Sequence, residues 1–264
     1  MAEITAASVM ALREQTQQGM MECKRALQEA NGDAEVAKEI LRKKGLVKIG
    51  AKADRATKEG VIVVKISPDN TAATMIAVAC ETDFCSRNAE FRSMSQKVLD
   101  LAAAAPLGPV PASDAINEAV QGCFAKIGEN MSYSQGVNVA AARVAGYVHH
   151  NGKVGVVIAA DGGASDEVLK DICMHIAFTN PMGIAKEDVP ANLVEKEKAF
   201  ALQEALDSGK PADIAEKMVA GKIGKYLAAN ALLEQPFVKD ETKKVKDLLG
   251  GATIKAFARF AIGS

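Results

Sequence analysis

Two stretches of the chain share one pattern, and this repetition constrains the fold more than any other feature. Each stretch has two segments rich in β-branched or apolar residues, a turn between them, and then an amphipathic helix. The first comprises strands over 61–66 and 74–80, a turn at 68–70, and helices over 88–104 and 113–126. The second comprises a strand from Gly146, a turn at 149–152, a strand over 154–159 and a helix over 166–178. The pattern predicts an α+β fold, with a two-part α/β core of antiparallel sheets, each covered by helices on one side.

The residues before this core predict a small helical module. Apolar positions fall at helical spacing in three short segments, Asn31-Gly32 stops the second segment, and Asp33 can cap the third. We expect Val36, Ile40 and Leu41 to form the buried face of the third helix and Gly45 to end it. A bundle of this size is marginal alone and is typical of a docking module.

A second helical segment interrupts the core. Between residues 187 and 231 the strand signals disappear, and the sequence predicts two helices broken at Ser208-Gly209-Lys210-Pro211. The residues expected in the contact between these helices are Leu193, Phe200 and Leu206 on one helix, and Ile214, Met218 and Ile223 on the other. Such a hairpin would project from the core.

These patterns divide the chain into five parts. They are a helical module (1–45), a connector (46–59), a first core part (60–140), a second core part (141–186 and 232–264) and the helical hairpin (187–231). The connector is basic and has little apolar periodicity, so a solvated tether and a basic strip that faces a binding partner both remain open for it.

Composition excludes several classes of function. The chain has 32 basic and 33 acidic residues and a net charge of −1, which argues against direct nucleic-acid binding. Only 4% of residues are aromatic and Trp is absent, so stacking surfaces for bases are scarce. No apolar run reaches the length of about 20 residues that spans a bilayer, so no membrane partner is expected. The five cysteines are odd in number and lack a C-x-x-C pair, which predicts reduced thiols in a cytoplasmic protein.

A search for catalytic motifs finds none. The sequence has no phosphate-binding glycine loop and no G-x-S-x-G nucleophile elbow. Its three histidines are His149, His150 and His175, and the last is expected to be a packed helix residue. Cys80 and Cys85 have no histidine close in sequence, which favours two buried thiols over a nucleophile. We therefore expect no enzyme, no cofactor and no metal site.

The segment ETDFCSRNAEF, residues 81–91, is the least ordinary part of the sequence. It places Asp83 and a bare phenyl ring, Phe84, where the second predicted strand passes into a helix. In one interpretation these residues are a helix entry, with the aspartate as cap and the phenylalanine as a hydrophobic staple. In the other they contact a binding partner.

Five segments resemble the elongation factor Ts family and occur in its order along the whole chain. They are LREQTQQGMMECKRALQEANGD (12–33), TDF (82–84), AKIGEN (125–130), SGKPADIAEKMV (208–219) and QPFV (235–238). The resemblance implies a guanine-nucleotide exchange factor for the GTPase elongation factor Tu, acting in translation elongation. It also implies that residues 1–45 form a ubiquitin-associated-like module. The hairpin 187–231 would be a coiled-coil dimerisation domain that makes a homodimer.

The resemblance also assigns residues to the partner interface. In this family the acid and the phenyl ring of TDF enter the GTPase beside its nucleotide-bound magnesium, so the roles fall to Thr82, Asp83 and Phe84. Arg13, Met20 and Met21 match positions that dock the nucleotide-binding domain, and adjacent exposed methionines suit an adaptable interface. Ile127 and Gly128 match another contact to that domain, and His150 matches a contact to a more distal domain.

Two departures from the family pattern stand near these residues. Gln17-Gln18 replaces the small residues that usually precede the paired methionines, and Cys85-Ser86 follows TDF where valine and alanine are common. Two other functions compete with exchange. One is a non-catalytic ubiquitin-associated-type adaptor whose core is only a scaffold, and the other is an enzyme that uses Cys80 or Cys85.

Overall fold

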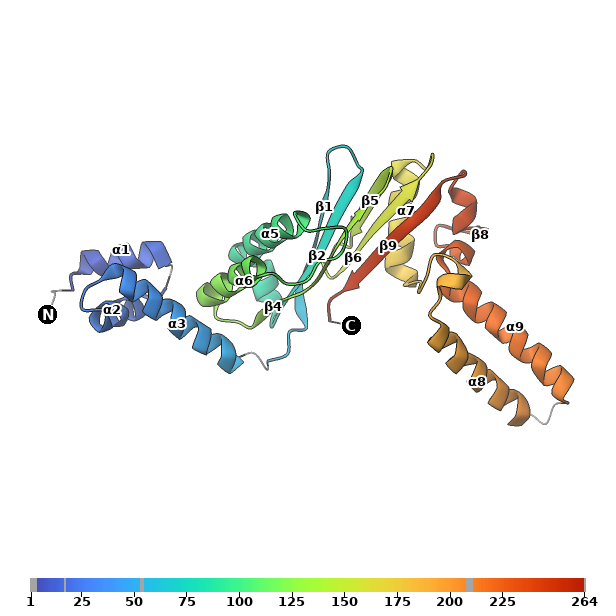
Figure 1. Ribbon diagram of the computed structural model, residues 1–264, viewed down its shortest axis with the longest axis horizontal. Coiled ribbons are helices and arrows are strands. Elements are labelled where there is room, and N and C mark those ends of the chain that lie inside the picture. Colours follow the sequence, from blue (N-terminus) through green and yellow to red (C-terminus); the bar gives the residue numbers. More distant parts are fainter. Residues whose placement is uncertain (1–3, 17, 53–54, 208–210, 264) are drawn as a thin grey trace.

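A computed structural model describes residues 4–16, 18–52, 55–207 and 211–263. Its elements lie along one long axis, with three helices at one end, two sheets in the middle and a helical hairpin at the other end (Figure 1). All strand pairings within the sheets are antiparallel, and this mixture of helices and antiparallel sheets confirms the α+β prediction.

The first three helices are α1 (Ala6–Thr16), α2 (Met20–Glu29) and α3 (Ala34–Lys52). They share a small apolar cluster that includes Leu12, Cys23 and Leu27. The Asp33 carboxylate accepts hydrogen bonds from the N–H groups of Glu35 and Val36, as expected of a cap.

Two predictions for the third helix are wrong. The helix does not end at Gly45 but continues to Lys52, so the first seven residues of the predicted connector are helical. A glycine ends a helix when it adopts the left-handed conformation, and Gly45 does not have a positive φ. Val36, expected in the buried face, is 45% exposed.

The first sheet has the order β1-β2-β4-β3, and the second has the order β5-β6-β9. The strands of the first sheet are β1 (Glu59–Ile66), β2 (Ala72–Cys80), β3 (Gly108–Pro109) and β4 (Met131–Ala140). Those of the second are β5 (Arg143–Val148), β6 (Val154–Asp161) and β9 (Thr253–Ala261). A separate pair joins β7 (Pro236–Phe237) to β8 (Asp240–Lys244).

The two sheets pack face to face, and helices cover their outer faces (Figure 1). The helices on the first sheet are α5 (Ala89–Ala103) and α6 (Asp114–Ile127), and the helix on the second is α7 (Asp166–Thr179). Strand β2 is buried on both faces, because alternate residues point in opposite directions along a strand. Ile76 and Val78 face the helices, whereas Met75 and Ala77 face the second sheet.

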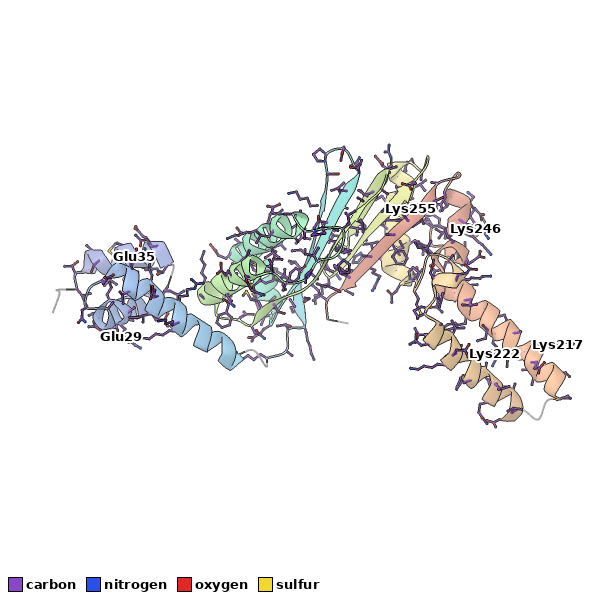
Figure 2. All side chains as sticks on the ribbon, in the orientation of Figure 1. Glu29, Glu35, Lys217, Lys222, Lys246 and Lys255 are labelled. Atoms are coloured by element: carbon purple, nitrogen blue, oxygen red, sulfur yellow. The ribbon has the colours of Figure 1, made fainter. Side chains whose placement is uncertain are left out.

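The hairpin consists of α8 (Ala191–Asp207) and α9 (Ala212–Asn230), and residues 208–210 of the predicted break lie outside the described residues. Its buried seam is made by Ala201, Ala205, Ala215 and Val219. Large apolar side chains expected in this seam are exposed instead: Phe200 by 67%, Leu206 by 54% and Ile214 by 42%. The sequence analysis placed bulky apolar residues in the contact between the helices. The contact is made mainly by alanines instead, which allow the two helix backbones to lie closer together. Lys222, labelled in Figure 2, forms an ion pair with Glu204 of α8, and this pair also joins the helices.

Short 3₁₀ turns complete the connections, at Lys186–Asp188, Leu232–Glu234 and Val245–Leu248. The hairpin is fastened to the core through His175, which is fully buried as expected of a packed helix residue. Its Nδ1 accepts a hydrogen bond from the Val238 N–H at 3.3 Å, so Nε2 carries the proton and donates to Gln235 Oε1 at 2.8 Å. Gln235 in turn donates to the Ala229 carbonyl of α9. Burial lowers the pKa of His175, which keeps this imidazole neutral.

Candidate functional site

The TDF segment forms a short, well-anchored helix entry after β2. Helix α4 (Asp83–Arg87) has Thr82 as its N-cap, and the Thr82 hydroxyl accepts a hydrogen bond from the Cys85 N–H at 3.2 Å. Cys85 and Ser86, the residues that depart from the family pattern, are the buried residues of this helix. The buried side of α4 therefore lies on the core, and its first turn faces outward.

Asp83 and Phe84 occupy that outward turn. The Phe84 side chain is 81% exposed and belongs to none of the apolar clusters of the described residues. The Asp83 carboxylate forms an exposed ion pair with Arg87 at 3.1 Å. The interpretation of a plain helix entry is thus wrong on both counts, because Thr82 is the cap and the phenyl ring is not a staple. A rigidly based, exposed phenyl ring is suited to binding another molecule.

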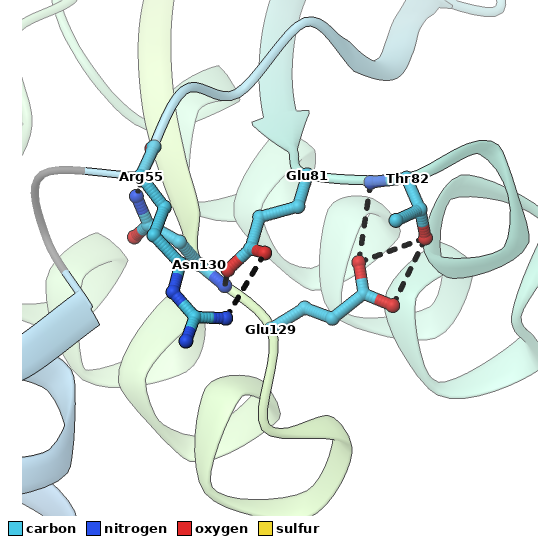
Figure 3. A network of polar contacts seen from close by, with 5 residues as sticks. All are labelled: Arg55, Glu81, Thr82, Glu129 and Asn130. Carbon is cyan, nitrogen blue, oxygen red and sulfur yellow. Dashed lines mark hydrogen bonds and ion pairs between the residues drawn. The ribbon is translucent and has the colours of Figure 1, made fainter.

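A network of hydrogen bonds connects the TDF segment to the loop after α6 (Figure 3). The Glu129 carboxylate accepts from the Thr82 N–H at 3.2 Å and from the Thr82 hydroxyl at 2.9 Å. In the opposite direction, the Glu81 carboxylate accepts from the Asn130 N–H at 2.6 Å. Arg55 joins from the segment before β1, with its carbonyl accepting from Asn130 Nδ2 and its guanidinium 3.5 Å from Glu81. We call the contacts among residues 81, 82, 129 and 130 the clasp.

Ile127 and Gly128 lie immediately before the clasp. Ile127 is half-buried against the core cluster under α5 and α6. Gly128 caps α6 in the left-handed conformation, with φ of 79°, and its N–H donates to the Phe124 carbonyl. A glycine meets this φ without strain, which turns the chain sharply and directs Glu129 toward Thr82.

His150 comes from the other half of the core and reaches the same region as Asp83. Both residues line a cleft of about 860 Å³ between α4, α5, β1 and the turn that joins β5 to β6. The turn is held in place by a hydrogen bond from the Ile62 N–H to the Gly152 carbonyl. The rings of His149 and His150 lie 4.2 Å apart, and the His149 Nδ1 is 2.8 Å from the Tyr147 hydroxyl.

Arg13, Met20 and Met21 lie on the helical module and are not brought against the TDF segment. Arg13 is in the last turn of α1, while Met20 and Met21 begin α2 and are 43% and 58% exposed. Two polar contacts place this module beside α6. Gln18, a departure from the family pattern, donates to the Ala125 carbonyl at 3.1 Å, and Arg42 forms an ion pair with Glu118 at 3.1 Å.

The described residues offer no support for the thiol enzyme. All five cysteines are buried and unpaired, and burial raises the pKa of the Cys85 thiol to about 11 and that of Cys80 still further. A thiol in this state is a poor nucleophile. Within the parts of the chain that the structure describes, no group of three or more His, Cys, Asp or Glu side chains could hold a metal ion.

The clasp is the part of this site that the sequence did not predict. Glu129 and Asn130 belong to the AKIGEN segment, but their contact with residues 81 and 82 spans almost fifty positions of the chain. No local pattern in a single sequence reveals such a pairing. The role of Gln18 in joining the module to α6 was also unpredicted.

Comparisons with known proteins agree on one family. A family model described as Elongation factor TS matches residues 81–264. The chain is 42% identical to elongation factor Ts of Thioalkalivibrio sulfidiphilus, over 98% of this chain and 92% of that protein. It is 42% identical to elongation factor Ts of Nitratiruptor, over 98% of this chain and 93% of that protein. It is 43% identical to elongation factor Ts of an Enterobacter strain, over 100% of this chain and 93% of that protein.

Proposed function

The chain belongs to the elongation factor Ts family, and from this membership we propose that it is a guanine-nucleotide exchange factor for the GTPase elongation factor Tu. It would bind the GDP-loaded GTPase and promote GDP release during translation elongation, in the cytoplasm. Among the described residues no helix has the length and apolar character of a membrane span. The adaptor alternative is not favoured, since it gives no role to Asp83 and Phe84.

The observation that carries the proposal is the exposed ring of Phe84 beside the half-exposed carboxylate of Asp83, on a helix entry anchored to the core. Magnesium bridges and neutralises the phosphates of a bound nucleotide, so a disturbance of its water shell weakens nucleotide binding. In our proposal Asp83 brings negative charge to that shell. Phe84 inserts between side chains of the GTPase, and its burial there stabilises the displaced arrangement.

Such a factor changes an equilibrium and a barrier without breaking a covalent bond. It must bind the nucleotide-free GTPase more tightly than the loaded form, and by linkage GDP must then weaken its own binding to the GTPase. An acceleration of roughly 10⁴-fold would require the barrier to GDP release to fall by about 5.5 kcal/mol. One buried phenyl ring does not supply this alone, so a broad interface is needed.

The remaining partner residues supply that interface in our proposal. Arg13, Met20 and Met21 would dock the nucleotide-binding domain from the ubiquitin-associated-like module, and Ile127 with Gly128 would contact the same domain from the end of α6. His150 would contact a more distal domain of the GTPase. Support comes from exposure of the two methionines and from the cleft that Asp83 shares with His150.

The test of the proposed function is release of labelled GDP from purified elongation factor Tu. Adding the chain at micromolar concentration with excess unlabelled nucleotide should accelerate GDP release by orders of magnitude. The reason is that the chain binds the nucleotide-free GTPase more tightly than the GDP-loaded form and so stabilises the state in which GDP leaves. The same chain after heat denaturation serves as the control. Release at the spontaneous rate, despite measurable binding to the GTPase, would favour the adaptor.

We propose that the hairpin 187–231 forms a coiled-coil contact between two copies of this chain. The support is its surface: Phe200, Leu202, Leu206 and Ile214 are each more than 40% exposed, although the alanine seam already holds α8 and α9 together. Leu202 and Leu206 are four residues apart and so lie on one side of α8. A second hairpin would cover these apolar side chains.

Replacing Phe200 and Leu206 with serine should therefore abolish self-association and leave the hairpin folded, because neither residue contributes to the buried seam. Light scattering should show the mass falling from about twice 27.7 kDa to 27.7 kDa. Phe178→Ser removes a phenylalanine outside the hairpin that is even more exposed than Phe200, and it is the matched control. An unchanged mass for the folded double variant would contradict the proposal.

A further inference from the structure

Glu129 is hydrogen-bonded to Thr82, next to the proposed partner contacts Asp83 and Phe84, but is not itself among the residues matched to the partner interface. We propose that Glu129 is a positioning residue, whose carboxylate fixes the direction in which Asp83 and Phe84 project. The inference rests on the proposed exchange function for its consequence, since the direction of these residues matters only if they enter a GTPase. Its structural part concerns the free protein alone.

The hydrogen bonds of Thr82 depend on Glu129. Both of its donors, the backbone N–H and the hydroxyl, point to the one carboxylate of Glu129. Because the hydroxyl donates its single proton there, its lone pairs are left to accept from the Cys85 N–H and cap α4. One carboxylate therefore sets both the backbone and the side-chain orientation of the cap (Figure 3).

Glu129 is itself held in place by its neighbours. It follows the left-handed turn at Gly128 that ends α6, and α6 is anchored in the core by buried Ile116 and Phe124. The neighbouring Asn130 N–H donates to the Glu81 carboxylate at 2.6 Å. The clasp therefore joins residues 81 and 82 to residues 130 and 129 by two adjacent sets of hydrogen bonds. Hydrogen bonds to a charged group are about twice as strong as neutral ones.

Helix α4 cannot fix its own orientation. A helix of five residues has too few internal hydrogen bonds to be stable alone. Phe84 is 81% exposed and belongs to none of the apolar clusters of the described residues, so burial in the core does not fix the direction of its ring. The direction of the phenyl ring must come from the base of α4, and the clasp together with buried Cys85 and Ser86 forms that base.

The structural part is tested by amide hydrogen exchange of the free, full-length chain. Glu129→Gln keeps the side-chain shape and one acceptor oxygen, but it removes the negative charge and replaces the second oxygen with an NH2 group, which cannot accept a hydrogen bond from Thr82. We expect exchange at the Cys85 and Ser86 amides to become faster by tenfold or more, because their bonds to Thr82 weaken. Glu90→Gln is the control, because it removes the carboxylate of an exposed ion pair that joins Glu90 of α5 to Lys126 in the last turn of α6.

The functional part is tested by GDP release at increasing concentrations of the chain. Glu129→Gln should lower the maximal release rate by about tenfold and change the half-saturating concentration less than about twofold, since the docking surfaces remain intact. Thr82→Val, which lacks the hydroxyl that caps α4, should also lower the maximal release rate, and Thr82→Ser, which keeps the hydroxyl, should preserve that rate. The double variant Glu129→Gln/Thr82→Val should be little worse than either single one.

Three results would overturn the proposal. The first is unchanged exchange at Cys85 and Ser86 in Glu129→Gln. The second is a raised half-saturating concentration with a normal maximal rate, which would make Glu129 a direct contact. The third is simple multiplication of the two single effects in the double variant. If the wild-type chain failed to accelerate GDP release, the proposed function would fall, while hydrogen exchange would still decide whether the clasp orients α4.

Discussion

We expect Phe84→Ala to slow stimulated GDP release by roughly 30- to 100-fold, because a central aromatic side chain typically contributes about 2–3 kcal/mol to the free energy of an interface. The same substitution should change the free energy of unfolding by no more than about 0.5 kcal/mol, since the ring is 81% exposed in the free protein. Phe178→Ala is the matched control, because Phe178 is 82% exposed on α7. Thermal unfolding and GDP release are measured on each variant.

Asp83→Ala separates the charge from the ring. It should also slow GDP release with magnesium present, and the difference from the wild-type chain should shrink when magnesium is chelated, because the step that the acid assists has already occurred. A different result would be a Phe84→Ala protein that loses about 3 kcal/mol in its free energy of unfolding and still stimulates GDP release normally when folded. Such a protein would show that Phe84 is a packing residue. That result would refute the proposed insertion of Phe84 between side chains of the GTPase.

Removal of residues 1–52 should raise the half-saturating concentration for GDP release at least tenfold, an affinity loss of about 1.4 kcal/mol or more, and largely preserve the maximal rate. The reason is that Arg13, Met20 and Met21 are lost as docking contacts while the clasp and the TDF segment stay intact. The cut is placed after Lys52 because α3 extends that far and the Arg55 carbonyl accepts from Asn130.

The shortened chain should fold, since the apolar cluster of α1, α2 and α3 is separate from the core clusters. Circular dichroism and thermal unfolding check this point before any kinetic comparison. In the full-length chain, Met20→Ser/Met21→Ser should reproduce part of the loss. Wild-type half-saturation by the folded, shortened chain would remove the docking role from this module.

Local patterns of the sequence predicted most of the core and part of the helical module. Hairpins, turns and amphipathic helices have signals within ten to twenty residues, and α5, α6 and α7 begin and end within one residue of expectation. Strand β4 was not predicted, because MSYSQGVNVA mixes polar and small residues and draws its pairing from β2 and β3. The end of α3 was misplaced because glycine is compatible with both a helix interior and a helix end.

The site shows the same division. The position of Asp83 and Phe84 was visible in the sequence because an acid and a phenyl ring follow an apolar strand. Their assigned role came from family resemblance, and their exposure needed the structure. Contacts between distant segments, such as Glu129 with Thr82 or Gln18 with Ala125, leave no trace in a single sequence.

The double-sided burial of β2 has an energetic consequence for the residues that follow it. A loop that becomes ordered on binding loses conformational entropy, about 1–2 kcal/mol for each residue fixed. Because β2 is packed on both faces up to Cys80, and the next residues are capped and hydrogen-bonded, this loss has been incurred during folding. Asp83 and Phe84 are thus preorganised, and the free energy of their contacts is available to displace the nucleotide instead of ordering the chain.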